Sequence, residues 1–316
     1  MRIAVDAMGG DNAPDLVIEG AILASKELAS DTKLILIGDE NIITSVLNKN
    51  GGKPSNIEVV HASEIIGMDE HPTKAISHKK DSSIIVGYQL LASKQADLFC
   101  SAGNTGAMLV GAMFTIKPIE GVLRPGIAGF IPQVSGRYGI LMDVGANTDC
   151  KPEVLVQFAE MASIFATDLY QIEKPRVGLI NVGEEEQKGS LLTQATYQLL
   201  KANPNINFVG NLEGRDIYCD KVDVMICDGF VGNVILKVSE GIYPLLKQRN
   251  FTDSFINMFQ WESVGGSPIL GVNGDVVIGH GSSGLMAIKN MILLSQNLAK
   301  SEISKKIKNA YSKVSS

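Results

Sequence analysis

The sequence predicts an α/β protein with a mainly parallel sheet and helices on both faces of that sheet. Short runs of Val, Ile and Leu alternate with helical patterns, and polar loops rich in Gly, Asn and Asp follow the runs. Strands that alternate with helices form right-handed βαβ crossovers, which build parallel sheets. Hydrophobic residues make up 45% of the 316 residues and charged ones 20%, as in globular proteins with a sizeable core. No Pro/Ser-rich linker divides the chain, so we expect a single α/β unit over residues 1–316.

The predicted strands are the short apolar runs that end in turn residues. They cover residues 2–6, 33–38, 57–61, 97–100, 139–144, 177–181, 222–227 and 276–278. Helices are expected over residues 14–28, 82–93 and 105–115, and the last is apolar nearly all round, so we expect it to be buried. We expect residues 240–264 to form a short helical insertion and the Lys- and Ser-rich tail, residues 301–316, to fray.

Composition excludes several classes of protein. The net charge of −6 argues against a nucleic-acid binder, which needs a positive face. Asp6 and Asp11 lie where a signal peptide needs an apolar core, and the longest nearly uncharged apolar stretch, residues 106–116, is too short to cross a bilayer. The four cysteines form no CxxC pair and the four histidines show no paired spacing. We therefore expect a cytoplasmic protein with reduced thiols and no metal site.

Six polar loops follow the carboxyl ends of predicted strands. In an open parallel sheet these ends line the usual ligand crevice, and backbone N–H groups at helix starts bind anions. Turns in any α/β protein are rich in the same residues, so a single loop is equally well explained as a turn. Six together favour a binding site. The loops are residues 6–11, 101–106, 143–149, 181–189, 228–233 and 279–283.

The loop over residues 101–106 (SAGNTG) is the strongest local signal. Gly103 and Gly106 permit close approach of the backbone, while Ser101, Asn104 and Thr105 supply side-chain donors at a helix start. The GxGxxG pattern of dinucleotide-binding proteins is absent from the chain.

Two further loops each leave two interpretations open. GEEEQKGS (183–190) nearly matches a P-loop, but Lys188 and Gly189 are transposed, so nucleotide hydrolysis is not indicated. Lys188 either holds a phosphate near a helix start or is a solvated lysine that offsets the three preceding glutamates. GHGSSG (279–284) lacks the last glycine of GxSxG, and His280 is either an acid, base or oxyanion donor or an incidental loop residue.

Ten stretches, in this order, closely resemble the PlsX family of phosphate acyltransferases of bacterial phospholipid synthesis. They are DAMGGD (6–11), KKDSS (79–83), SAGNTGA (101–107), GVLRP (121–125), LMDVGANTD (141–149), PRVGLINVGEEEQKG (175–189), NFVGNLEGRD (207–216), CDGFVGN (227–233), GGSPILG (265–271) and GHGSS (279–283). The resemblance extends from Met1 to about Leu294. It implies a fold similar to isocitrate/isopropylmalate dehydrogenases and to phosphotransacetylases, and a homodimer.

The resemblance also implies a reaction. Inorganic phosphate attacks the thioester of a long-chain acyl group on acyl carrier protein, and acyl phosphate and the free carrier thiol are the products. Phosphate is already nucleophilic at neutral pH, so the enzyme needs no cofactor and has to position the anion and stabilise an oxyanion. We expect phosphate-binding from Ser101, Gly103, Asn104, Thr105 and Gly106. We expect catalytic roles for Lys188, Asn233 and His280, and loop-ordering roles for Asp6, Asp143 and Asp228.

Other functions stay open from the sequence. One is a short-chain phosphotransacetylase that uses coenzyme A, and another is a non-catalytic scaffold that recruits lipid enzymes to the membrane. Expected partners are acyl carrier protein, inorganic phosphate and a second copy of the chain, with a peripheral contact to the membrane or to a membrane acyltransferase.

Two positions depart from the family pattern. Ser77 stands where the family usually has an arginine, so any phosphate role of that arginine falls to Lys79 or Lys80 or is absent. The stretch between Glu240 and Gly265 is short and carries Phe251, Phe255 and Phe259 at helical spacing. With so few basic residues there, a dimer contact or a core face is at least as well supported as a membrane helix.

Overall fold

The computed structural model describes residues 1–312, whose contacts divide the chain into two compact units. Unit 1 contains residues 1–119 and 261–305, and unit 2 contains residues 120–260 together with the described chain from residue 306. The chain therefore passes from one unit to the other three times. Each unit has its own strands and its own buried core, and a single functional unit over residues 1–316 stays a prediction.

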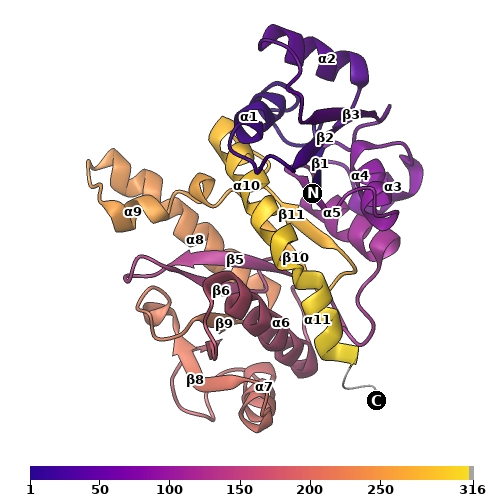
Figure 1. Ribbon diagram of the computed structural model, residues 1–316. Coiled ribbons are helices and arrows are strands. Elements are labelled where there is room, and N and C mark those ends of the chain that lie inside the picture. Colours follow the sequence, from indigo (N-terminus) through magenta and orange to yellow (C-terminus); the bar gives the residue numbers. More distant parts are fainter. Residues whose placement is uncertain (313–316) are drawn as a thin grey trace. The chain divides into compact units, whose positions relative to one another are not determined.

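Unit 1 contributes six of the described strands. They are β1 (Arg2–Asp6), β2 (Lys33–Gly38), β3 (Ile57–His61), β4 (Leu98–Ser101), β10 (Ser267–Leu270) and β11 (Asp275–Ile278). Their order is β3-β2-β1-β4-β11-β10. Figure 1 labels all of them except β4. The first five in this order are parallel to one another, and β10 pairs antiparallel with β11. The strands β1, β2, β4 and β11 are almost continuously buried and mostly apolar, as strands covered on both faces are.

The connections of unit 1 put helices on both faces of its strands. The helices are α1 (Asp15–Ser25), α2 (Glu40–Lys49), α3 (Pro72–His78), α4 (Ser83–Ala92), α5 (Thr105–Gly111) and α10 (Leu285–Ser301). The chain moves outward from β1 through α1 and α2 to β3, and returns past α3 and α4 to β4. Right-handed crossovers therefore place α1 and α2 on one face and α4 on the other (Figure 1). α10 packs against α1, and α5 packs against α3 and α4.

Unit 2 contributes five of the described strands, in the order β5-β6-β9-β7-β8. They are β5 (Gly126–Pro132), β6 (Tyr138–Met142), β7 (Arg176–Asn181), β8 (Asn207–Glu213) and β9 (Val224–Ile226). β5 and β6 form an antiparallel hairpin, and β6, β9, β7 and β8 are parallel. The mainly parallel α/β class predicted from the sequence is confirmed.

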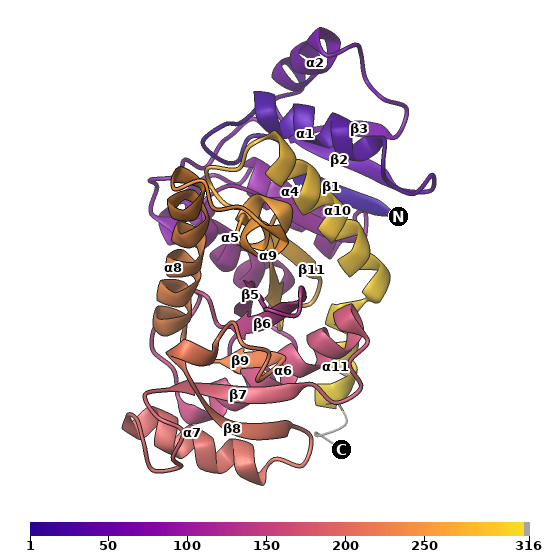
Figure 2. The same ribbon diagram turned by 90° about the vertical axis from the view of Figure 1, so that its left-hand side faces the viewer.

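Helices cover both faces of the unit 2 strands as well. The helices of unit 2 are α6 (Pro152–Tyr170), α7 (Leu191–Ala202), α8 (Gly229–Gln248), α9 (Ser254–Met258) and the part of α11 (Ile303–Ser312) that begins at Lys306. α6 and α7 pack together on one face, and α8 contacts β5 and β6 from the other (Figure 2).

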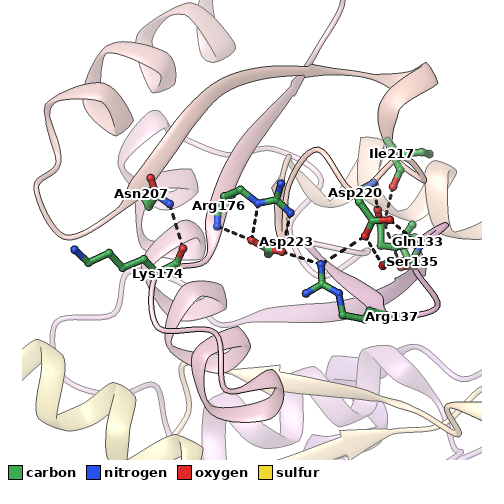
Figure 3. Close-up of polar contacts among 10 residues, drawn as sticks. Gln133, Ser135, Arg137, Lys174, Arg176, Asn207, Ile217, Asp220 and Asp223 are labelled. Atoms are coloured by element: carbon green, nitrogen blue, oxygen red, sulfur yellow. Dashed lines mark hydrogen bonds and ion pairs between the residues drawn. The ribbon is translucent and has the colours of Figure 1, made fainter.

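Ion pairs join the amino ends of the unit 2 strands. The carboxylate of Asp223, just before β9, accepts hydrogen bonds from the backbone N–H and guanidinium of Arg176 and pairs with Arg137 at 3.5 Å (Figure 3). Burial raises the pKa of Asp223, but the hydrogen bonds and charge of Arg176 outweigh it, and the net shift is downward. The network fixes the β5–β6 hairpin against β7 and β9.

Two expectations from the sequence are wrong. Residues 105–115 were expected to form one buried helix. The α-helix α5 ends at Gly111, and the chain continues as a π-helix over Ala112–Ile116, in which Met113 and Phe114 are exposed rather than buried. The tail expected to fray forms α11, because Ile307 is fully buried and one apolar side of the helix packs inward. Residues 313–316 of that tail lie outside the described residues.

Candidate active site

The loops after β1 and β4 meet at the point in unit 1 where the crossovers change face. The loop after β1 leads to α1 on one face, and the loop after β4 leads to α5 on the side of α4. Ser101 Oγ donates to Asp6 Oδ2 at 2.7 Å and accepts from the Gly103 N–H at 2.9 Å. In open α/β sheets ligands bind at such a switch point, beyond the carboxyl ends of the strands.

Asp6 is buried, and burial raises the pKa of its carboxyl group. Hydrogen bonds from Ser83, Ser101 and the Met8 N–H act in the opposite direction. The contact is close because Gly9 has no side chain: a Cβ there would lie 2.3 Å from Asp6 Oδ2. Asp6 and Ser101 thus bond to each other and to the backbone, which fixes the shape of both loops.

Asn104 is engaged at both ends of its amide. Its Oδ1 accepts from the Ala107 N–H and caps α5, while its Nδ2 donates to the carbonyls of Gly67, Met68 and Glu70 at 3.0–3.2 Å. The amide therefore ties the loop before α3 to the start of α5. Thr105, the first residue of α5, is exposed, and Gly106 is half-buried against Pro72.

The loop after β11 joins the same edge of unit 1. The Asp11 N–H donates to the Gly281 carbonyl at 2.8 Å, and Asn12 Nδ2 donates to the Ser283 carbonyl at 3.1 Å. His280 lies in this loop, with Nδ1 2.8 Å from Ser282 Oγ and its ring 4.6 Å from the ring of Trp261. Three loops predicted from the sequence are thus brought together in unit 1.

Unit 2 has a switch point of its own between β6 and β9. Asp143 follows β6, is fully buried, and accepts from the backbone N–H groups of Ile127, Ala146 and Asn147. Burial raises the pKa of Asp143, and these hydrogen bonds act against the rise. The Gly229 N–H donates to the Asn147 carbonyl at 2.7 Å, so the loops after β6 and β9 are joined.

Asp228 and Asn233 lie at the start of α8, which leaves β9 for the opposite face. Asp228 Oδ1 accepts from the Val231 N–H at 2.8 Å and caps the helix. Asn233 is exposed on the second turn, next to Gly145, where a Cβ would lie 3.4 Å from Asn233 Oδ1. Asn233 therefore borders the loop that Asp143 holds.

Lys188 is exposed in the loop after β7, also in unit 2. Its carbonyl accepts from Asn181 Nδ2 at 3.1 Å, which fixes the backbone before α7. Two of the three preceding glutamates pair elsewhere: Glu184 with Lys221 and Glu186 with Lys201. Lys188 has no ion pair among the described residues, so offsetting these two glutamates does not explain it.

One group of carboxylates within the described chain is close enough to share a metal ion: Glu184, Glu213 and Asp216. The ammonium group of Lys221 lies 2.8 Å from Asp216 and 3.2 Å from Glu184. A lysine thus already supplies positive charge to this group.

The structure shows the surroundings of the two places where the sequence departs from the family pattern, near Ser77 and between Glu240 and Gly265. Lys79 pairs with Glu70 and donates to the Ile65 carbonyl, and Lys80 donates to the Ile76 carbonyl. Phe259 is buried and packs against Tyr218 and Phe255, whereas Phe251 is exposed. The aromatic spacing in this segment therefore reflects, in part, a core face.

The structure groups the predicted residues by unit. Asp6, the residues of loop 101–106 and His280 lie on unit 1, and Asp143, Lys188, Asp228 and Asn233 lie on unit 2. Sequence reasoning did not single out Gly9 and Asn147, which contact Asp6 and Asp143 at the two switch points. A signal for both was available: Gly9 belongs to a Gly pair directly after a strand, and Asn147 is an Asn in a polar loop.

Comparison with known proteins identifies the family. A family model described as "Fatty acid synthesis protein" matches residues 1–249. A phosphate acyltransferase of Endomicrobium trichonymphae is 48% identical and covers 98% of this chain and 97% of its own length. That of Dictyoglomus turgidum is 41% identical, with 99% and 98% covered. The chain belongs to the phosphate acyltransferase family. The alignment with the first relative spans 334 positions, more than the 316 residues of this chain, so the relative carries residues that this chain lacks.

Solved structures confirm the fold predicted from the sequence. A phosphotransacetylase from Streptococcus pyogenes superposes with a TM-score of 0.69 at 16% identity, and the match covers 95% of this chain and 94% of the phosphotransacetylase chain. The EutD phosphotransacetylase of Staphylococcus aureus gives 0.63 at 15% identity, with the same coverage. Among residues 1–312, no helix combines the length and hydropathy needed to cross a bilayer.

Proposed function

We propose that this protein moves a long-chain acyl group from acyl carrier protein to inorganic phosphate, an early step of phospholipid synthesis. The match to curated phosphate acyltransferases over nearly the whole chain carries this proposal. A phosphate oxygen attacks the thioester carbonyl, a tetrahedral oxyanion forms, and the C–S bond breaks as it collapses. The proton lost by hydrogen phosphate ends on the sulfur, which leaves as the carrier's thiol.

The candidate residues suggest a division of roles. Ser101, Gly103 and Asn104 are committed to hydrogen bonds or close contacts within the loops, so in our proposal they shape the phosphate site. Thr105 and the N–H groups of the first turn of α5, with Gly106, then contact the anion. Lys188 supplies positive charge, and His280 and Asn233 stabilise the oxyanion or the leaving thiolate.

The substrate test compares thioesters. Purified protein is given phosphate with acyl carrier protein and coenzyme A thioesters of several chain lengths, and acyl phosphate and released thiol are measured. We expect long-chain acyl carrier protein to be the preferred donor. Preference for short-chain coenzyme A thioesters would instead indicate a phosphotransacetylase, and no phosphate-dependent loss of thioester would indicate a scaffold.

Lys188→Ala tests the phosphate role. Because the ammonium group is exposed and lacks a carboxylate partner among the described residues, its loss should leave folding intact. The variant should raise the phosphate KM or lower kcat by about a hundredfold or more, as losses of preorganised charge commonly do. Lys201→Ala, an exposed lysine of the same unit paired with Glu186, is the matched control. Unchanged phosphate kinetics in Lys188→Ala would show that Lys188 is a solvated surface lysine with no role in phosphate binding.

A homodimer is the proposed assembly. α8 carries an exposed apolar stripe at helical spacing, formed by Phe230, Val234, Val238 and Leu245, each at least 48% exposed. A second copy that covers the stripe would remove it from water. Val238→Glu should therefore shift the protein to monomer in sedimentation experiments. A wild-type chain that sediments as a monomer at all concentrations would contradict the proposal.

The proposed location is the cytoplasm, with peripheral contact to the membrane. The four cysteines are free thiols, as in a reducing compartment. Exposed Phe251 supplies an apolar contact for a membrane surface, and co-sedimentation with anionic lipid vesicles tests it.

A further inference from the structure

Backbone hydrogen bonds hold the loop that carries His280. The Gly279 N–H, directly before the histidine, donates to the Ser101 carbonyl at 2.8 Å, so His280 lies beside the loop that follows β4. The Ser283 N–H donates to the His280 carbonyl at 2.9 Å and closes a tight turn. Asn12 Nδ2 donates to the Ser283 carbonyl at 3.1 Å, so the loop after β1 holds this turn. The backbone of His280 is therefore fixed against both neighbouring loops of the candidate site.

One nitrogen of the His280 imidazole ring contacts Ser282 twice. The Ser282 backbone N–H donates to Nδ1 at 3.2 Å, and Ser282 Oγ lies 2.8 Å from the same nitrogen. A backbone N–H can only donate, so Nδ1 presents its lone pair to it. In a neutral imidazole one nitrogen accepts and the other carries the proton. The proton of the neutral ring is therefore on Nε2.

Trp261 fixes the plane of the same ring. The centroids of the indole and imidazole rings are 4.6 Å apart and their planes differ by 33°, so the indole covers one face of the imidazole. The segment that carries Trp261 is tied to α10, because Asn290 Nδ2 donates to the Glu262 carbonyl at 2.8 Å. Half a turn of the imidazole about its Cβ–Cγ bond would put a C–H group opposite the Ser282 N–H and lose that hydrogen bond. The contacts therefore select both the plane of the ring and its tautomer.

We propose that Ser282 is a positioning residue, which holds His280 as a neutral imidazole with its proton on Nε2, and that this N–H stabilises the oxyanion of acyl transfer. The inference deepens the proposed function and rests on it, because the oxyanion forms only when phosphate attacks the thioester. A neutral Nε2–H donates a hydrogen bond and keeps its proton. The proton that ends on the sulfur then comes from hydrogen phosphate, and His280 is a donor rather than an acid.

Nitrogen NMR of the full chain with isotope-labelled histidine measures the tautomer without turnover. The spectrum is recorded at pH 8, above the usual histidine pKa of about 6.5. The other three histidines are exposed, and their substitution by Gln assigns their signals and leaves those of His280. We expect His280 to carry its proton on Nε2 alone.

His78 provides the contrast within the same spectrum. Its Nδ1 lies 2.8 Å from the Lys74 carbonyl, which can only accept, so His78 should carry its proton on Nδ1. A proton on Nδ1 of His280, in a singly or doubly protonated ring, would overturn the inference. This result is independent of acyl transfer, so it is distinguishable from a failure of the proposed function.

Substitutions of His280 test which nitrogen acts in the reaction. Gln places a neutral N–H donor near the position of Nε2, whereas the shorter Asn places one near Nδ1. His280→Asn should lower kcat by about a hundredfold or more, as the loss of an oxyanion donor commonly does. His280→Gln should keep at least about tenfold more activity than His280→Asn. Equal losses in the two folded variants would overturn the inference, because neither amide replaces a group that acts as an acid.

Ser282→Ala and Ser282→Thr test the positioning role at an exposed residue whose variants should fold. Both keep the backbone N–H, but only Thr keeps a hydroxyl beside Nδ1. Ser282→Ala should lower kcat about fivefold, leave the phosphate KM unchanged and raise the share of His280 protonated on Nδ1. Ser282→Thr should restore both kcat and the tautomer.

Ser93→Ala is the matched control, because the Ser93 hydroxyl is exposed and donates to the Gln89 carbonyl at the end of α4. It should leave kcat and the His280 signals unchanged. Circular dichroism and thermal unfolding establish that each variant is folded. A folded Ser282→Ala with wild-type kcat and an unchanged His280 tautomer would overturn the positioning role, as would a loss of kcat that Ser282→Thr does not restore.

Discussion

Asp6 and Asp143 hold corresponding positions at the residue scale, one in each unit. Asp6 ends β1 and Asp143 follows β6, and both are buried carboxylates at a switch point. Each accepts hydrogen bonds from the backbone of its own loop, and burial raises the pKa of each. A buried acidic group bonded to several N–H donors fixes a loop more firmly than a neutral turn would. The polar loops are thus held in shape before any substrate binds.

Asp275 makes stability depend on pH. Burial raises the pKa of this carboxyl group from 3.8 to about 6, although the Ser304 N–H donates to it. The folded state therefore holds the proton more tightly than the unfolded state, and stability should fall as pH rises from about 4 to about 6. Asp275→Asn removes the ionisable group and should be more stable than wild type above pH 6, by up to about 3 kcal/mol.

Urea unfolding of both proteins at pH 4, 5, 6 and 7 measures the effect of Asp275. The two free energies of unfolding should diverge between pH 4 and 6 and stay apart at pH 7. Curves that remain parallel over this range would show that Asp275 titrates alike in the folded and unfolded chain.

At the scale of elements, α8 can pack closely against the loop after β6 only because residue 232 is a glycine. A Cβ at Gly232 would lie 1.9 Å from the carbonyl oxygen of Asp143, whereas one at Gly241 in the same helix meets nothing within 4 Å. Gly232→Ala should lower the free energy of unfolding by about 1–3 kcal/mol through overpacking. Gly241→Ala should raise it, by about 1 kcal/mol at most, because Ala favours the helix. Chemical denaturation compares the two, and equal effects would contradict this account of the contact.

The sequence predicts some strands residue for residue and misses others for a physical reason. β1, β2 and β3 agree with the predicted ranges because each is an apolar, β-branched run between turn residues. β5, β8 and β10 were not predicted. They contain Gly129, Gly210 and Pro268, residues of low strand propensity, and their pairing with neighbouring strands stabilises them instead.

The sequence predicts which loops belong to the candidate site, but not which of their residues contact one another. Asp6 and Ser101 are 95 residues apart, and their contact depends on β4 lying beside β1. Strand order is a property of the whole sheet, which local patterns do not encode. The sequence likewise suggests that Asn104 donates a hydrogen bond to phosphate. In the structure its amide donates instead to backbone carbonyls of a loop that lies 34–37 residues earlier in the chain.

At the scale of the whole molecule, we expect charge to govern the approach of acyl carrier protein, the proposed partner. The chain carries a net charge of −6, and acyl carrier proteins are typically acidic, so docking needs a local basic patch. Lys79, Lys305 and Lys306 are already paired with Glu70, Glu302 and Asp168. Lys247 and Arg249, at the end of α8, are exposed and have no carboxylate partner among the described residues.

We therefore expect the KM for acyl carrier protein to rise with salt, as screening weakens the attraction. The double change of Lys247 and Arg249 to Glu should raise that KM and leave the phosphate KM unchanged. Lys305→Glu is the control, because this lysine is already paired with Glu302. A KM that ignores both salt and the double change would point to an apolar docking surface.

The three passages of the chain between the units bear on how the protein is synthesised. β4 ends at Ser101, yet its neighbour β11 begins only at Asp275. During synthesis on the ribosome, the edge of β4 that pairs with β11 therefore stays unpaired for more than half of translation. Its free backbone N–H and C=O groups can pair with another chain in that time. Unit 1 is the first to begin and cannot be finished until α10 has emerged. A fragment that stops before residue 261 contains all five described strands of unit 2 but lacks β10 and β11 of unit 1. The edge of β4 that pairs with β11 then stays unpaired, and another chain can pair with it and start aggregation.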